Sequence, residues 1–150
     1  MTTYKSFSSA ETKSLASELA RRVLREKSRV RGAFVVALHG DLGSGKTTFT
    51  QGFASELGVK KRITSPTFIL MQRHGLRGQQ FRNLYHIDCY RIKKAKEFLA
   101  IGLREILADP KNIVLIEWPE KIKAILPKSA IKISFAHSKR QNERIIKIYP

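Results

Sequence analysis

The chain has little of what disulfide-rich, zinc-binding and membrane proteins need. Its 150 residues include a single cysteine, Cys89, which excludes an internal disulfide, and four histidines that are not clustered at zinc-ligand spacing. No apolar run approaches the roughly 18 residues of a membrane span, and the first residues lack the apolar core of a signal peptide. These absences predict a soluble, cytoplasmic protein without a membrane partner, in which a metal arrives only with a ligand.

Acidic residues are also scarce. The 12 Asp and Glu residues stand against 29 Lys and Arg residues, which gives a formal net charge of +17. Such an excess fits a nucleic acid, an acidic protein partner or simply a very basic surface. The basic residues are spread along the chain, so charge alone does not decide between these readings. The length and the hydrophobic content of 42% predict one globular domain over residues 1–150.

One motif stands out, at Gly40–Thr47. It fits the phosphate-loop pattern G-x-x-x-x-G-K-[ST] without a mismatch. The apolar run at 33–38 predicts a buried strand before it, and apolar spacing predicts an amphipathic helix from Lys46 to Leu57. Loop N–H groups and the helix N-terminus would bind phosphate, with Lys46 at the β- and γ-phosphates and the Thr47 hydroxyl on Mg²⁺. The predicted nucleotide-binding residues here are Asp41, Leu42, Gly43, Ser44, Gly45, Lys46, Thr47 and Thr48.

Two further segments carry candidate carboxylates. A second apolar run, Ile113–Ile116, ends at Glu117, and a buried strand ending in an acid commonly holds Mg²⁺ beside a phosphate loop. The segment Phe81–Arg91 is predicted to be the returning strand of a hairpin. Alternation along it would place His86, Asp88 and Tyr90 on one face. That face is either a polar site or the solvent side of an edge strand.

Two loops are weaker candidates. Thr64 and Ser65 precede Pro66, which places the start of the next strand near Thr67. The two hydroxyls either sense the γ-phosphate or shape a turn. The turn around His137 to Arg140, between two predicted tail strands, is a candidate for contact with adenine, through His137 and Arg140.

The other predicted elements are helical. Apolar spacing predicts a first helix from Ser8 to near Lys27, a helix over Glu97–Leu107 and a short helix from Pro119 to Pro127. Alternating residues after 130 predict the two tail strands. Helices and strands therefore mix along the chain, as in an α/β protein.

Four motifs occur in one order: Gly40–Phe49, Thr64–Phe68, His86–Arg91 and Glu117–Glu120. Together they resemble the TsaE (YjeE-type) phosphate-loop ATPases, small bacterial proteins of tRNA threonylcarbamoyladenosine synthesis, over about residues 8–150. The resemblance implies a single-domain, three-layer P-loop NTPase-like fold with a mixed parallel and antiparallel central sheet. It also implies action with the TsaD and TsaB proteins and ATP and Mg²⁺ as ligands.

The resemblance also implies residue roles. Lys46 and Thr47 keep their phosphate and Mg²⁺ roles, and Glu117 matches the metal-site glutamate of the family. Asp88 matches its essential aspartate, so Lys46, Asp88 and Glu117 form the predicted catalytic set, and Thr47 and Glu117 the metal set. Ser44 and Cys89 depart mildly from the family pattern without removing a functional group.

The implied reaction is Mg²⁺-dependent hydrolysis of ATP to ADP and phosphate, slow without partners, which resets the partner complex. A first alternative is a small-molecule kinase, although the sequence shows no lid-like insertion between Gly58 and Asp109. A second is a nucleotide-switched RNA-binding module, which predicts salt-sensitive affinity for tRNA. Contact with tRNA through a basic surface is also an expected partner interaction of the ATPase.

Overall fold

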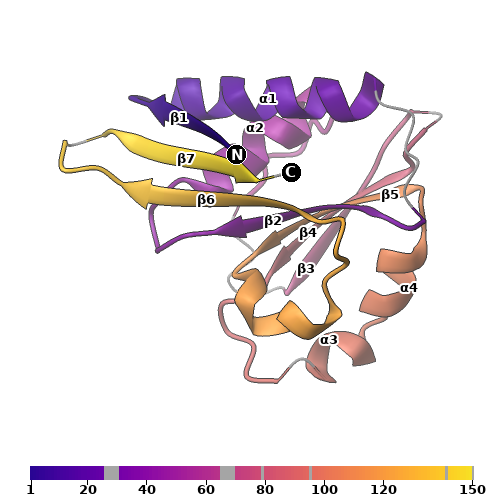
Figure 1. Ribbon diagram of the computed structural model, residues 1–150. Coiled ribbons are helices and arrows are strands. Elements are labelled where there is room, and N and C mark those ends of the chain that lie inside the picture. Colours follow the sequence, from indigo (N-terminus) through magenta and orange to yellow (C-terminus); the bar gives the residue numbers. More distant parts are fainter. Residues whose placement is uncertain (26–30, 65–69, 79, 95, 141, 150) are drawn as a thin grey trace.

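The computed structural model describes residues 1–25, 31–64, 70–78, 80–94, 96–140 and 142–149. Its centre is a seven-stranded sheet in the order β1-β7-β6-β2-β5-β4-β3 (Figure 1). Strands β6, β2, β5 and β4 are parallel, and β1, β7 and β3 pair antiparallel at the two sides. The predicted mixed sheet is therefore confirmed. The strands are β1 (Thr2–Ser6), β2 (Phe34–His39), β3 (Met71–Gly75), β4 (Asn83–Asp88), β5 (Asn112–Glu117), β6 (Ile131–His137) and β7 (Arg144–Tyr149).

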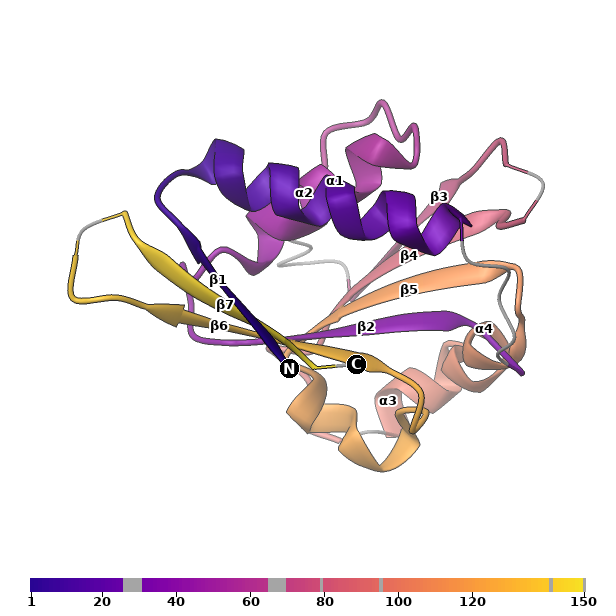
Figure 2. The same ribbon diagram turned by 45° about the horizontal axis from the view of Figure 1, so that its top comes forward.

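Helices cover both faces of the sheet, which gives the predicted three layers (Figures 1 and 2). On one face lie α1 (Ser9–Arg25) and α2 (Lys46–Glu56). On the other lie α3 (Lys96–Ala100), α4 (Leu103–Ala108) and the 3₁₀ helix η1 (Pro119–Ile125). Among the described residues, no helix is both long enough and apolar enough to cross a membrane.

Alternation along the central strands divides the core in two. Val36 of β2 and Leu115 of β5 pack toward α1 and α2, where Phe49 is also fully buried. Val35 and Val114, one position earlier on the same strands, pack toward α3, α4 and η1. Cys89 belongs to this second core, where burial raises the pKa of its thiol to about 12. It is an apolar packing residue rather than a nucleophile.

The parallel strands place the candidate polar residues at one edge of the sheet. β2 ends at His39, directly before the phosphate loop, while β4 ends at Asp88 and β5 at Glu117. The register pairs Glu117 with Leu38 on one side and with Asp88 on the other. Ligands of open α/β sheets bind outside these carboxyl ends, so the fold positions one site from three separate segments.

Several predicted elements differ from the structure. β1 was not predicted, because Thr2–Ser6 lacks apolar alternation; it forms by antiparallel pairing with β7. The helix predicted over 97–107 is two helices, because Gly102 adopts a left-handed conformation with φ 85° between them. The strand predicted over Phe81–Arg91 is shorter, since β4 ends at Asp88 and a turn follows.

Two predicted boundaries fall outside the described residues. The strand start expected near Thr67 lies outside the described residues, and β3 itself begins at Met71. The first helix was expected to end near Lys27, and α1 is described to Arg25. The helix after the phosphate loop is confirmed, with Leu57 as its C-cap.

Gly52 permits α1 and α2 to pack closely. A Cβ added there would lie 2.6 Å from Lys13 Cα, and the Gly52 carbonyl accepts a hydrogen bond from Ser17 Oγ at 3.1 Å. Helix propensity favours Gly52→Ala by about 1 kcal/mol, but the clash is with backbone and α1 must shift. We expect the variant to lose about 1–3 kcal/mol of unfolding free energy in a urea titration. Ser55→Ala, on the exposed side of α2, is the control, and equal stability of the two variants would contradict close packing.

Candidate nucleotide-binding site

The phosphate loop connects the end of β2 to the start of α2. Gly45 is the N-cap of α2 and has φ 109°, a conformation that side chains disfavour. Gly40 has φ 144°, and a Cβ there would stand 2.5 Å from the Phe135 carbonyl oxygen of β6. Glycine at these positions therefore lets the loop curl against the sheet edge, so that the N-terminus of α2 points into the space above it.

Lys46 lies at the centre of the loop. Its ammonium donates to the carbonyl oxygens of Gly40 at 2.6 Å and Asp41 at 2.8 Å, and the side chain is buried. Burial lowers the pKa of Lys46, opposed by the negative charge of Glu117 first and then of Asp88, Glu120 and Asp41. The surrounding carboxylates thus favour the charged ammonium, the form that binds phosphate.

One aromatic side chain covers Lys46, and a second packs on the first. The Lys46 Nζ lies 4.4 Å from the centre of the Trp118 ring, a cation–π contact. Tyr90 packs on Trp118 with ring centroids 5.1 Å apart. Trp118 has a left-handed backbone, with φ 56° and ψ 50°, which is strained for a bulky residue and redirects the chain directly after Glu117. Trp118 also lines the cavity beside Lys46.

Glu117 is the acceptor on which two side chains converge. It is 3% exposed. The Thr47 hydroxyl donates to its Oε1 at 3.1 Å, and His86 Nε2 lies 2.9 Å from the same oxygen. Because a carboxylate only accepts, Nε2 carries the hydrogen of this bond. The carboxylate is therefore held at the first turn of α2 from two directions.

Asp88 stands beside Glu117. The two are register partners on β4 and β5, and Asp88 Oδ1 accepts the backbone N–H of Tyr90 at 2.9 Å. His86 and Asp88 share the face of β4 that looks toward α2, as the alternation predicted. Tyr90 lies beyond the end of the strand, so its place on that face by alternation was wrong, although its ring reaches the same cavity through the turn.

His86 contacts the candidate metal ligand Glu117, although no role of its own was predicted for it from the sequence. Its side chain is fully buried, and Nδ1 has no hydrogen-bond partner in the described part of the chain. A buried imidazole with one unmet nitrogen is costly, and its remaining bond goes to Glu117. The signal was present in the sequence, because His86 alternates with Asp88.

We expect His86→Leu to raise the Mg²⁺ concentration for half-maximal ATP turnover by about tenfold or more, because partners that orient metal ligands typically contribute 10–100-fold. His86→Gln is the matched variant, since its amide N–H can reach the position of Nε2. A Mg²⁺ titration of turnover for both variants, with folding checked by thermal unfolding, tests this. Equal loss in the two variants would show that His86 acts by packing instead.

These residues surround a cavity of about 300 Å³. The loop, the ends of β4 and β5 and the two aromatic side chains all contribute to it. The lining residues are Leu42, Gly43, Gly45, Lys46, Thr47, Thr48, Asp88, Tyr90, Glu117 and Trp118.

A second cavity, of about 410 Å³, shares Gly43, Gly45 and Thr48 with the first. Its other walls come from the start of α1 and from the β6–β7 hairpin, which the β1–β7 pairing brings together. These remaining lining residues are Phe7, Ser8, Ser9, Thr12, Asn142 and Arg144, none of which was predicted. The phosphate loop therefore separates two hollows.

Six predicted residues lie outside both cavities or outside the described chain. His137 Nε2 is 3.3 Å from the Leu42 carbonyl oxygen, so it contacts the loop itself rather than lining either hollow. Arg140 is exposed on the hairpin. Thr64 is exposed, and Ser65 lies outside the described residues. Of the remaining phosphate-loop residues, Asp41 is exposed and Ser44 is buried with its hydroxyl unpartnered among the described residues.

The oxygen atoms of Thr47 and Glu117 fit one Mg²⁺ ion. They meet at 3.1 Å at the wall of the first cavity, and both are hard ligands. Among the described residues, no group of three or more His, Cys, Asp or Glu side chains is placed to hold a metal. This small donor set suits Mg²⁺, which usually takes one or two protein ligands and completes its shell with phosphate oxygens and water.

Comparisons of the sequence with known proteins all point to one family. The family model described as threonylcarbamoyl adenosine biosynthesis protein TsaE matches residues 6–146. The tRNA threonylcarbamoyladenosine biosynthesis protein TsaE of Haemophilus influenzae is 36% identical over 108 residues, which cover 72% of this chain and 66% of that protein. The protein of the same name from Bacillus subtilis is 39% identical over 66% of this chain and 59% of its own length. The matched stretches thus span about two-thirds or less of the length of these two relatives.

A solved structure shows the same fold. The crystal structure of YdiB from Bacillus subtilis aligns with 97% of this chain and 82% of that chain, at a TM-score of 0.72 and 31% sequence identity. The match includes both the parallel centre of the sheet and its antiparallel sides, since nearly the whole chain is aligned.

Proposed function

The chain belongs to the TsaE family of threonylcarbamoyl adenosine biosynthesis proteins, as its four motifs predicted, and from that premise we propose that it binds and hydrolyses ATP with Mg²⁺ for this modification of tRNA. The carrying observation is the convergence of Thr47, His86 and Glu117 at the first turn of α2, with Asp88 next to them in register. A phosphate loop with an acid on the neighbouring strand is the arrangement of Mg²⁺-dependent nucleotide hydrolases.

The two cavities suggest how ATP lies. The triphosphate follows the loop past Gly43, Gly45 and Thr48, which border both hollows. The γ-phosphate then lies on the side of Lys46, Asp88 and Glu117. The nucleoside lies on the side of Phe7 and Asn142, rather than at the turn from His137 to Arg140, which was a weaker candidate from the sequence. Ligand pockets are mostly concave and partly apolar, and Phe7 supplies an apolar surface for a base.

The chemistry follows from this placement. Lys46 exchanges its bonds with the loop carbonyls for phosphate oxygens, and its charge offsets the charge that develops on the transferring group. Thr47 and Glu117 hold Mg²⁺, which supplies further positive charge at the phosphates. Asp88 orients the attacking water and accepts its proton. Trp118 covers one side of Lys46 and excludes water there, which strengthens the interaction of Lys46 with phosphate.

We further propose that turnover is slow in the isolated chain and is completed by TsaD and TsaB, with ATP hydrolysis resetting their complex. The cavity beside Lys46 opens to solvent at exposed Leu42 and Tyr90. A partner that covers this opening would position the attacking water. Phosphoryl transfer depends mostly on positioning, so an open site is expected to be slow.

Phosphate release from ATP by the purified protein, alone and with TsaD, TsaB and an unmodified tRNA transcript, tests the proposal. We expect Mg²⁺-dependent release that rises when the partners are added. A rate that the partners leave unchanged would contradict the role in their complex. Transfer of the γ-phosphate to a small acceptor, detected as a phosphorylated product, would instead make the protein a kinase.

A further inference from the structure

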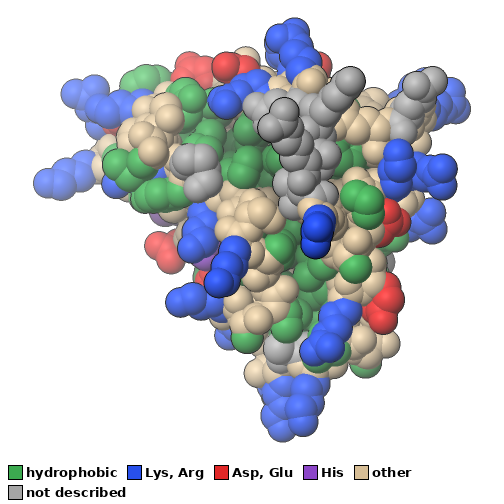
Figure 3. Space-filling view, turned by 45° about the vertical axis from the view of Figure 1, so that its right-hand side comes forward, with side chains coloured by type: hydrophobic (Ala, Val, Ile, Leu, Met, Phe, Trp, Pro, Cys, Tyr) green, Lys and Arg blue, Asp and Glu red, His purple; other side chains and the backbone are tan. Residues whose placement is uncertain are grey.

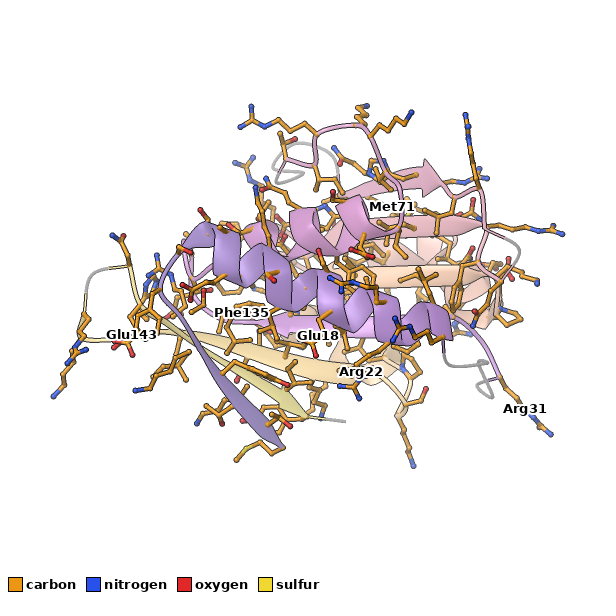
Figure 4. All side chains as sticks on the ribbon, turned by 90° about the horizontal axis from the view of Figure 1, so that it is seen from above. Glu18, Arg22, Arg31, Met71, Phe135 and Glu143 are labelled. Carbon is orange, nitrogen blue, oxygen red and sulfur yellow. The ribbon has the colours of Figure 1, made fainter. Side chains whose placement is uncertain are left out.

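A basic cleft lies at the far end of α2 from the phosphate loop. Two hollows of about 390 and 460 Å³ adjoin there and share Val59, Lys60 and Lys61. The smaller hollow lies between Lys13 of α1, the later part of α2 and the segment that follows α2. The larger lies between that segment and β3, the last strand of the sheet, with the start of the β3–β4 connection. Figure 2 shows the segment that follows α2 above the sheet on the side of α2, and β3 at the edge of the sheet beside β4. In Figure 4 they lie beyond α2, near the labelled Met71 at the start of β3.

The lining of the cleft carries one sign of charge. No Asp or Glu belongs to it, and the ion pairs among the described residues involve none of its cations. Helix-dipole compensation accounts for a lysine just after α2 but not for cations on the β3 side. Concave surfaces lined by one sign of charge concentrate the potential. The cations are Lys13, Lys60, Lys61, Arg62, Arg73 and Arg77.

We propose that this basic cleft binds the phosphate backbone of RNA. A run of phosphates matches six cations spread over two adjoining hollows, because each phosphate needs its own neutralising contact. The choice of RNA over another polyanion rests on the proposed function in tRNA modification, whereas the anion site rests on the geometry alone.

The cleft lacks the apolar anchors of a protein interface. Protein partners usually bury large hydrophobic or aromatic side chains at the centre of their contact. In the described part of the chain, no exposed large hydrophobic side chain lies in the cleft; those present are Met1, Phe7, Leu24, Leu42, Tyr90, Ile101 and Tyr149. Figure 3 shows Lys and Arg side chains scattered over one face among uncharged side chains, so the concave shape, rather than charge alone, distinguishes the cleft.

A double substitution with one residue on each wall tests the proposal. Lys61→Ala/Arg77→Ala removes two exposed cations, so folding is preserved. Fluorescence anisotropy with a labelled, unmodified tRNA transcript is measured over a series of KCl concentrations. We expect affinity to fall about tenfold or more, and the slope of log affinity against log salt to fall by about two.

Lys93→Ala/Lys94→Ala is the matched control, since it removes the same charge from exposed positions just before α3, on the opposite face. We expect the control to bind tRNA within about twofold of the unmodified chain. Equal losses in the two pairs, or no tRNA binding by the unmodified chain, would overturn the proposal. Binding of polyglutamate in preference to tRNA would also overturn it and assign the cleft to an acidic protein.

Binding of a fluorescent ATP analogue separates this inference from the proposed function. We expect the Lys61/Arg77 variant to keep its nucleotide affinity, because neither residue lines the nucleotide cavities. If the unmodified chain hydrolyses ATP but does not bind tRNA, only the proposal that the cleft binds RNA is overturned. If the unmodified chain binds tRNA at the cleft in a salt-dependent way but does not bind ATP, only the proposed ATPase function is overturned.

Discussion

Asp88→Asn is expected to lower ATP turnover about 100-fold or more while nucleotide affinity stays within about threefold. A positioned acid–base group typically contributes 10²- to 10⁴-fold to a rate. Asparagine keeps the shape and the oxygen that accepts the Tyr90 N–H, so the turn after β4 is preserved. What it loses is the ability to take a proton from water. Single-turnover phosphate release, alongside the affinity for a fluorescent ADP analogue, measures the two effects separately.

Asp109→Asn is a close control for this substitution. Asp109 Oδ1 also accepts the backbone N–H two residues later, that of Lys111, at 2.8 Å. Both changes therefore remove a carboxylate and keep the same local hydrogen bond, but Asp109 lies outside the two nucleotide cavities. Unchanged turnover in Asp88→Asn would remove the catalytic role from Asp88. A loss shared by both variants would point to local folding instead.

The phosphate-loop side of the site was predictable because its determinants are local in sequence. A strand, a glycine loop and a helix follow one another without interruption, and each has its own periodic signal. Glu117 was predictable for a similar reason, since it terminates an apolar run. Its closeness to Thr47 then follows from the parallel pairing of β2 and β5, which short apolar strands favour.

The nucleoside side was not predictable, because it depends on contacts between the two ends of the chain. Phe7 and Asn142 share a cavity only because β1 pairs with β7. The segment Thr2–Ser6 has no apolar alternation from which a strand could be predicted. The register, rather than propensity, makes it one. The predicted place of Tyr90 on a strand face and the predicted single helix across Gly102 were wrong for a different reason. In both cases a turn ended a periodic element earlier than its apolar pattern indicated.

Glu117→Gln is expected to raise the Mg²⁺ concentration for half-maximal turnover about tenfold or more. Glutamine keeps an oxygen that accepts from Thr47 and His86, so the first turn of α2 and the buried imidazole retain their partner. Only the negative charge is lost, and charge is what favours a carboxylate as a Mg²⁺ ligand. A Mg²⁺ titration of phosphate release measures this. If the Mg²⁺ concentration for half-maximal turnover were unchanged, Glu117 would not be a metal ligand.

The same variant carries a second, independent effect through Lys46. Burial lowers the pKa of Lys46, and Glu117 is the strongest charge opposing that shift. Without this charge the pKa falls further, so the ammonium is lost at a lower pH as the solution becomes alkaline. Nucleotide affinity without Mg²⁺ should therefore decline at lower pH in Glu117→Gln than in the unmodified chain. If nucleotide affinity declined at the same alkaline pH in both proteins, the electrostatic link between Glu117 and Lys46 would be disproved. Because this measurement contains no metal, that result would not bear on the role of Glu117 as a metal ligand.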